Sequence, residues 1–547
     1  MRQLRRGALT VLLIFPYIIS QEAWAENEAE ANTAGNKVVE LPAVSVTATR
    51  TEREIDLTSK PVTIITREQI EARNARTVVE LLADVPGVSF SRAGGLVGQA
   101  VVRGFNTNDP RALLLIDGDR FRGRNTLEYT LLDPNQIERI EVIRGPASTL
   151  YGPDALAGVI NIITRRAQGD ATGAFGLKVR LGALNFNSVN DLYGGRAELE
   201  GLGNGVDLLL GINGRTANDY ESPEGTIPNS DLETLSADLR LGYTPILGHH
   251  LELTAKYAEV EAGDAGGISG RPGAPLLSVR RDPIRERFIK LGYTGENPGL
   301  GLEQIQASVY ARELFTNIPS ENRTIPNRLT ELENIVDGPL VIGGKLLGTL
   351  PWGDNLLTAG IDFFHEDRKG SESSQRVTNF NPDGSVKSVM EFPRSQDGPD
   401  SKQTDVGVFV HNDWYPSDRW TLSLGGRADY IRSTTETDPL IDEGLREAFE
   451  HGKESTETPL TGGLGLIYRP WESLHFTANI NKAFRAPATF ESFGASRFGT
   501  GFLVPNPDLE SEEAITYELG TRLRLPGLNA NLTGFFSDYT NLIVRRT

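Results

Sequence analysis

From about residue 172 onward, apolar and polar residues alternate in segments of roughly ten residues. In Phe175–Leu181, for example, apolar residues occupy every second position, which places them on one face of a β-strand. Segments of this length and period are typical of transmembrane β-barrels, although a soluble all-β protein shows the same alternation. Fifteen segments follow the pattern, with approximate spans 173–183, 189–200, 206–216, 232–244, 249–261, 286–295, 303–314, 340–349, 355–367, 402–415, 419–432, 459–469, 473–484, 512–524 and 528–540.

The connections between these segments alternate in length, and this favours the barrel. Outer-membrane barrels have short periplasmic turns and long external loops, whereas a soluble sandwich has no reason to separate loop lengths by side. The pattern therefore predicts an all-β transmembrane antiparallel barrel over residues 172–547. Short turns occur at 201–205, 245–248, 297–299, 351–354, 416–418 and 470–472, and long polar loops at 217–231, 262–285, 315–339, 368–401, 433–458 and 485–511.

Fifteen is an odd number of strands, whereas single-chain bacterial barrels close with an even number. The chain stops at Val544–Thr547, which is not a strand that could seal a barrel. We therefore expect the sequence to be incomplete at its C-terminus, unless one strand is miscounted.

Residues 51–168 have a different pattern and predict a small α+β domain. Arg67–Leu82 has helical spacing of its apolar residues. Leu113–Ile116 is a buried strand that runs into a turn, and Ile137–Ile143 alternates as a second strand.

The first 25 residues have the three parts of a secretory signal peptide. Met1–Arg6 is basic, Ala8–Ile19 is apolar, and Ala23-Trp24-Ala25 is a small-x-small cleavage site. A short membrane anchor is the alternative, but the apolar segment is too short to span a bilayer. Residues 26–50 follow as a flexible leader.

The leader ends in one short strand, with no visible hairpin partner. An unpaired strand near a terminus can donate its backbone to the edge of another protein's sheet. An ordinary first strand is an equally good interpretation. The segment consists of Val44, Ser45, Val46, Thr47, Ala48 and Thr49.

Composition excludes several classes of protein. No stretch of about 20 residues after residue 19 is free of charge, which excludes a helical membrane protein. The formal net charge of −18 argues against nucleic acid as a partner. Cysteine is absent, so there is no disulfide, Cys-ligated metal or thiol nucleophile. The sequence has no G-x-S-x-G, GxxxxGK[ST] or HExxH motif, and we expect no enzyme. A passive porin is the remaining rival class.

Ile143–Gly152 contains Arg144, Gly145, Pro146, Tyr151 and Gly152, and Ala155–Thr164 follows it. These stretches resemble the plug of TonB-dependent outer-membrane receptors, and Val102–Phe105 and Ile116–Gly118 fit the same plug. Val44–Thr49 is similar to the TonB box in its usual position upstream. The resemblance implies a 22-stranded barrel filled by the plug, in the outer membrane of a Gram-negative bacterium, with about seven strands missing here.

The resemblance also implies active import. Ligand binds the external loops and the plug apex, which shifts the plug and frees the TonB box on the periplasmic side. TonB then pairs with the box by β-addition and pulls, using the proton-motive force of the inner membrane. The expected partners are TonB, the transported ligand and outer-membrane lipid, with no permanently bound cofactor.

Phe484-Arg485-Ala486-Pro487 and Asn506-Pro507-Asp508-Leu509 flank the seventh predicted external loop. They resemble the signature pair of heme and hemoglobin receptors. The resemblance implies import of heme, free or from heme proteins such as hemoglobin. Siderophore and cobalamin receptors carry similar sequence motifs, and a ferric-siderophore receptor is the alternative. For Arg485 and Asn506-Pro507, a purely structural role at the loop base is also possible.

Heme iron takes an axial ligand such as His or Tyr from the protein. Residues 1–248 contain no histidine, and Ala488–Pro505 contains neither histidine nor tyrosine. The best candidate pair is Tyr129 from the plug with His451 or His365 from the external side. Each of the three has the alternative of being a surface or barrel-wall residue. A siderophore would need no such ligand, because the chelator already fills the coordination of the metal.

Overall fold

The protein is described here from a computed structural model. The described residues are 44–45, 49–51, 53–75, 77–94, 97–106, 111–121, 129–169, 171–182, 184–264, 277–396, 399–436, 454–493, 496–498, 501–503, 506 and 508–544. The predicted signal peptide (1–25) and most of the leader lie outside them. No helix in this part of the chain is long and apolar enough to cross a bilayer.

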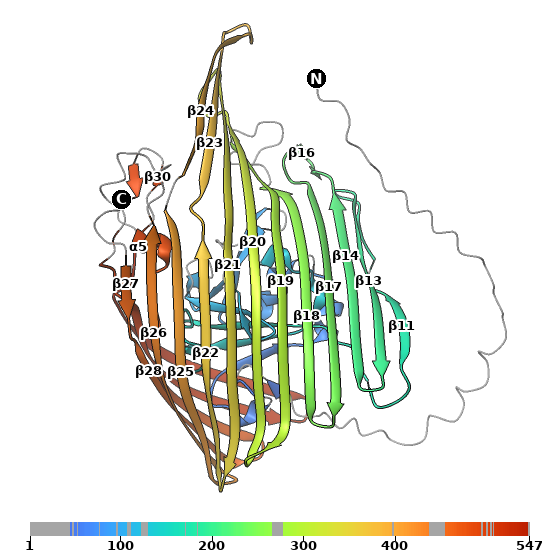
Figure 1. Cartoon of the computed structure of the whole chain (residues 1–547), viewed down its shortest axis with the longest axis vertical. Coiled ribbons are helices and arrows are strands. Elements are labelled where there is room, and N and C mark those ends of the chain that lie inside the picture. The colour runs from blue at the N-terminus through green and yellow to red at the C-terminus, as the bar shows by residue number, and fades with distance from the viewer. Residues whose placement is uncertain are drawn as a thin grey trace, which may run out of the picture. The chain divides into compact units, whose positions relative to one another are not determined.

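The alternating segments build one antiparallel sheet of 19 strands. Figure 1 shows this sheet with most of its strands labelled. Its strands are β11 (Gly176–Leu181), β12 (Asn185–Asn187), β13 (Leu192–Gly203), β14 (Val206–Ala217), β17 (Leu232–Ile246), β18 (His249–Gly263), β19 (Leu277–Gly299), β20 (Leu302–Asn322), β21 (Arg328–Trp352), β22 (Asn355–Arg368), β23 (Glu372–Phe380), β24 (Val386–Gln396), β25 (Asp400–Ser417), β26 (Trp420–Glu436), β27 (Glu454–Glu457), β28 (Leu460–Trp471), β29 (Leu474–Arg485), β32 (Glu512–Leu525) and β33 (Leu528–Thr540).

The strand pairing confirms the fifteen predicted segments. β11 and β12 both pair with β13, and β27 and β28 both pair with β26, so each of these pairs fills one position. β23 and β24 form a separate hairpin that pairs with the first part of β21. The remaining order follows the chain from β11 to β33, and each predicted short turn joins two neighbouring strands.

The prediction of a polar loop over residues 368–401 was wrong for most of its length. Residues Glu372–Phe380 and Val386–Gln396 are the β23–β24 hairpin. The hairpin forms because β21 extends beyond β22, and Arg328–Ile335 pairs with β23. Most of its side chains are polar, and those of β24 are almost all exposed, which hides the strand period.

The N-terminal domain has a mixed five-stranded sheet, and the strands predicted at 113–116 and 137–143 are confirmed. Its order is β3 (Val62–Ile65), β9 (Ile137–Arg144), β10 (Gly158–Thr164), β7 (Ala112–Ile116) and β8 (Asp119–Arg120), with β7 and β10 parallel. A second sheet contains β4 (Val88–Gly94), β5 (Val97–Val102) and β6 (Phe105–Asn106). The short helix α3 (Ser148–Tyr151) follows β9.

The helix predicted over Arg67–Leu82 is broken into two. Its first part, α1 (Arg67–Arg73), starts with a capping box between Thr66 and Gln69 and ends at Asn74. Asn74 has a left-handed backbone with φ 47°, which asparagine tolerates better than most residues. The chain restarts as α2 (Val78–Leu81), where the Thr77 side chain accepts a hydrogen bond from the Glu80 amide. The segment therefore forms two short helices, each with its own N-cap, instead of one long helix.

The N-terminal domain contacts the large sheet across most of its width. Its polar partners begin on β13, where Arg165 meets Glu198, and continue to β32, where Arg103 meets Glu518. The Arg103 guanidinium also lies 4.0 Å from the ring centroid of Phe535 on β33. Since all these partners belong to one domain, the sheet curves around it. The domain therefore occupies the concave face of the sheet, as expected for a plug.

Candidate functional site

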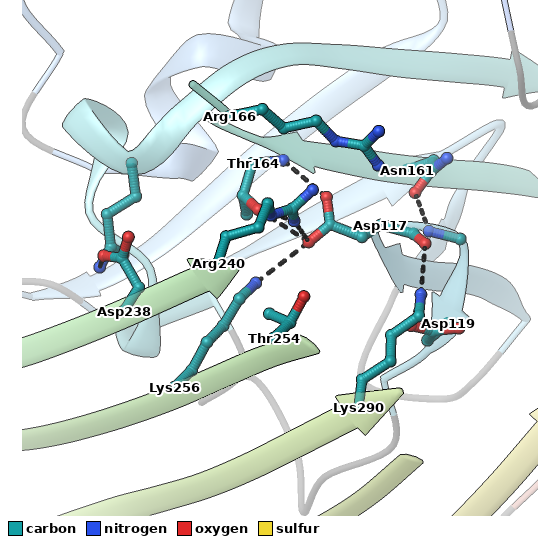
Figure 2. Close-up of polar contacts among 12 residues, drawn as sticks. Asp117, Asp119, Asn161, Thr164, Arg166, Asp238, Arg240, Thr254, Lys256 and Lys290 are labelled. Carbon is teal, nitrogen blue, oxygen red and sulfur yellow. Dashed lines mark hydrogen bonds and ion pairs between the residues drawn. The ribbon is translucent and has the colours of Figure 1, made fainter. Parts of the chain in front are cut away.

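The turn between β7 and β8 inserts two aspartates into a cluster of cations on the sheet (Figure 2). Asp117 Oδ2 accepts hydrogen bonds from Arg240 Nη2 at 2.8 Å and from Lys256 Nζ at 3.2 Å. Asp119 Oδ2 accepts one from Lys290 Nζ at 2.5 Å. The three cations come from neighbouring strands β17, β18 and β19. One plug turn is thus fixed to three strands of the wall.

The same turn is held from within the plug. The amide of Thr164, at the end of β10, donates to Asp117 Oδ1 at 2.8 Å, and the Gly118 amide donates to Asn161 Oδ1 at 3.1 Å. Burial alone would raise the pKa of Asp117, but Arg240, Lys256 and Lys290 hold that pKa well below its usual value. Asp117 is therefore an ionised anchor between plug and wall.

A second anchor joins the plug to the predicted receptor signature. Arg111, just before β7, pairs with both carboxylate oxygens of Glu512 on β32. Arg485 Nη1 lies 3.4 Å from the same carboxylate, and Arg485 Nη2 donates to Glu491 Oε2 at 2.6 Å. Glu491 belongs to α5 (Thr489–Phe493), at the start of the predicted external loop. Glu512 thus connects this loop, the barrel wall and the plug.

The Phe484–Pro487 signature is buried and contacts the plug rather than an open surface. Phe484 and Arg485 are 0% exposed. The backbone of Phe484 donates to Ser148 Oγ at 3.3 Å and accepts a hydrogen bond from the Asp154 amide at 3.3 Å. These contacts favour the structural interpretation of Arg485, at the base of the loop. Asn506 and Asp508 are exposed, with the Asp508 amide donating to Asn506 Oδ1, whereas Leu509 is half-buried and Pro507 lies outside the described residues.

The plug motif forms the turn that meets this signature. Arg144 reaches the carbonyl of Pro86 and the hydroxyl of Thr63, at 3.2 Å each. Gly145 has φ 96°, and a Cβ there would lie 2.5 Å from Glu518 Oε1. Gly145 therefore has to be glycine for both backbone and space. Pro146, Tyr151 and Gly152 are buried, and Gly152 has φ 74°.

The predicted TonB box is described only in part. Val44 and Ser45 form β1 and pair with β2 (Arg53–Glu54), so this end of the box has a hairpin partner that was not expected. Thr49 is buried, and its hydroxyl donates to the carbonyl of Thr51 at 2.9 Å. Val46, Thr47 and Ala48 lie outside the described residues.

Arg50, directly after the box, ties the leader to the wall. Its Nη1 donates to both oxygens of Asp362 on β22, at 2.7 and 3.0 Å. The guanidinium also lies 4.8 Å from the ring centroids of Tyr151 and Phe409. Arg427 on β26 shares the Asp362 carboxylate. Arg50 therefore joins the residue after the box to Tyr151 of the plug motif and to a carboxylate of the wall.

Of the predicted heme ligands, the structure describes Tyr129 and His365, and these two do not lie together. Tyr129 is 2% exposed and belongs to a hydrophobic cluster that plug and wall share, so an external ligand cannot reach its hydroxyl in this arrangement. His365 lies on β22 and is hydrogen-bonded to Thr404. It shares its face with exposed Ile361 and Phe363, opposite Asp362 on the plug side. His451 lies outside the described residues, among which no group of three metal-ligating side chains occurs.

The chain matches two family descriptions in the order that the fold requires. Residues 54–159 match the TonB-dependent receptor plug domain, and residues 164–547 match the TonB-dependent receptor-like β-barrel. The chain therefore belongs to the TonB-dependent receptors, β-barrel proteins of the Gram-negative outer membrane with an N-terminal plug.

One relative is the iron-regulated outer membrane virulence protein of Vibrio cholerae serotype O1, 27% identical over 91% of this chain and 69% of that protein. Similar solved structures include the hemophore receptor HasR of Serratia marcescens with its hemophore and heme (TM-score 0.68, 17% identity, 89% of this chain and 74% of that one). The ferric citrate transporter FecA has a TM-score of 0.66 and 18% identity, over 91% and 72%. The copper transporter OprC has a TM-score of 0.67 and 20% identity, over 87% and 71%. At these identities the structures show a common fold.

Sequence reasoning missed most of the anchors. Arg103 and Asp117 lie in the stretches that resemble the plug, but their partners Glu518, Arg240 and Lys256 were not singled out. One signal in the sequence could have found them: charged residues at the plug-facing positions of the predicted strands. A charged side chain inside a membrane barrel needs a partner of opposite charge. Alternation identifies such positions but does not say which charge of the plug each one meets.

Proposed function

We propose that this receptor imports an iron chelate across the outer membrane, with energy supplied by TonB. The observation that carries the proposal is the connection of the leader to the plug and the wall. Arg50 follows the predicted TonB box and binds Asp362 beside Tyr151 of the plug motif. A pull on the box acts first on this contact and then on the plug. The iron-regulated Vibrio relative and the likeness to FecA and HasR support iron as the cargo.

Heme and a ferric siderophore are the two candidate chelates. The Phe484–Pro487 and Asn506–Leu509 signatures support heme, and the likeness to HasR agrees with it. The burial of Tyr129 and the outward face of His365 favour a siderophore, since its iron needs no axial ligand from the protein. Hemin and a panel of ferric siderophores are therefore tested side by side.

Deletion of residues 44–49 tests the energy-coupled mechanism. Cells that express the receptor are given radioactive ferric chelates or hemin, and surface binding and uptake are measured separately. We expect the deletion to leave binding intact and to stop uptake, because TonB has lost its strand. A deletion of residues 30–35 in the leader is the matched control. Continued uptake without residues 44–49 would refute energy coupling through this segment.

A further inference from the structure

The wall opposite the Asp117–Asp119 turn carries more positive charge than the turn neutralises. Four cations face the turn from successive parts of the sheet, and we name them the cationic row: Arg240 on β17, Lys256 on β18, Lys290 on β19 and Lys345 on β21. Their side chains are at most 19% exposed while the plug is docked. Figure 2 shows the first three of them around the two aspartates.

The strand register places these cations within two residues of one level of the wall. Arg240 lies opposite Thr254, and Thr254 lies opposite Lys290, while Lys256 is two residues from Thr254 on the same face. Neighbouring strands are about 4.8 Å apart, so the row from β17 to β21 spans roughly 19 Å. Two acidic groups of one small molecule can therefore bind different members of the row at once.

The turn occupies the row only in part. Asp117 meets Arg240 and Lys256, and Asp119 meets Lys290. Lys345 Nζ stays 3.8 Å from the nearest oxygen of Asp119, beyond hydrogen-bond distance. Two carboxylates of the plug thus stand against four cations of the wall.

The wall itself supplies little compensation at this level. Glu252 lies 3.4 Å from Arg240, and it is also 3.8 Å from Arg166 at the end of the plug domain. Asp238 is taken up by Arg196, with contacts of 2.6 and 2.8 Å. If the turn moves away, the row keeps its four cations. Glu252 then remains beside Arg240, and Asp362, which Arg50 and Arg427 share, lies opposite Lys345 in the strand register. Uncompensated charges in a poorly hydrated wall attract an anion strongly.

We propose that the cationic row is an anion-binding site that the plug covers at rest and uncovers when it moves. Its ligand is the chelate in transit, one that carries two or more carboxylates. In the docked state, the carboxylates of Asp117 and Asp119 occupy the positions that the carboxylates of the chelate would take. The inference rests on the proposed function, because the plug must move for the site to open. The competing explanation is that the four cations serve only to hold the plug.

Ion conduction through the purified full-length receptor in a planar bilayer tests the site without TonB. The plug is held in the barrel by side-chain contacts, whereas the barrel strands are joined by continuous ladders of backbone hydrogen bonds. Urea therefore displaces the plug at a lower concentration than it unfolds the barrel. The probe is citrate, added to the opened channel in KCl. We expect citrate to block the chloride current of the unchanged receptor. In K256Q/K290Q the half-blocking concentration of citrate rises about tenfold or more.

The matched control is R287Q, which removes an exposed arginine from the same strand as Lys290, where it pairs with Glu313. It should be blocked like the unchanged receptor. K345Q removes the cation with the weakest plug contact and replaces K256Q/K290Q as the test variant if the latter does not fold. For K345Q we expect a smaller rise in the half-blocking concentration of citrate. D117N/D119N should keep the block but open at lower urea. Equal block in K256Q/K290Q, K345Q and R287Q, or no block at all, would overturn the site. Energised uptake would stand in that case, because it is measured separately.

Discussion

At the scale of single residues, the plug is held by buried charges whose partners are far apart in sequence. Asp117 and Arg240 are one example, and Arg111 and Glu512 are another. The sequence could identify Asp117 as part of a plug-like motif, and the alternation could place Arg240 on the plug side of its strand. It could not pair them, because pairing depends on how the plug is rotated inside the sheet. The same limit applies to Tyr129, whose burial could not be read from the motif beside it.

Replacing Asp117 by asparagine should destabilise the docked plug by about 3–5 kcal/mol, because buried cations then lose their counter-charge. The pKa of Asp117 is lowered in the folded protein. Its stabilising effect is therefore complete above the ordinary aspartate pKa of about 3.9 and is lost as the pH falls through the lower folded value. Thermal unfolding of the plug should differ strongly between the two proteins at pH 7 and converge well below pH 4. A constant difference down to pH 2 would contradict this assignment.

Gly145→Ala should weaken the same interface from the plug side. The residue has φ 96°, and its new Cβ would meet Glu518 Oε1 at 2.5 Å and Arg103 Nη1 at 2.8 Å. We expect a loss of roughly 1–3 kcal/mol, measured by urea unfolding of the plug. Gly173→Ala is the matched control, since nothing lies within 4 Å of a Cβ at that position. Equal stability of the two variants would argue against a required glycine.

At the scale of elements, the alternation of apolar and polar residues predicted the strands correctly where one face meets lipid and the other meets the plug. It failed for β23–β24, since a largely exposed hairpin has no reason to alternate. It also could not show that Asn74 breaks the helix predicted over Arg67–Leu82. The alternation around Ile361 and Phe363 also indicates that His365 lies on the face of β22 that points away from the plug.

The leader is the element on which TonB is expected to act, and Arg50→Ala should release it. The substitution removes the contact with both oxygens of Asp362. We expect a cysteine placed at Ser45 to react faster with a maleimide in the R50A background, by roughly tenfold for a loss of about 1.4 kcal/mol. The matched control is R432A, which removes an exposed ion pair with Glu454. Equal labelling in both backgrounds would show that Arg50 does not restrain the box.

At the scale of the whole molecule, the order of leader, plug and barrel could be predicted from local sequence motifs and from the alternation of apolar and polar residues along the chain. The cargo could not, because recognition depends on side chains that converge from the plug and the wall. Within the signature, Phe484 and Arg485 are fully buried at the base of the loop. The central claim is therefore mechanical: import requires the plug to leave its position when the leader is pulled.

The most direct test is a reversible lock between plug and wall. A Cβ on Gly465 of β28 would lie 3.2 Å from Cβ of Ser59, close to disulfide geometry, and the chain has no other cysteine. Uptake of a ferric chelate that the unchanged receptor imports is measured in energised cells carrying S59C/G465C, with each single variant as control. The account predicts normal surface binding but no uptake when the pair is oxidised, and recovery after reduction. Uptake at the unchanged rate through the oxidised pair would contradict it.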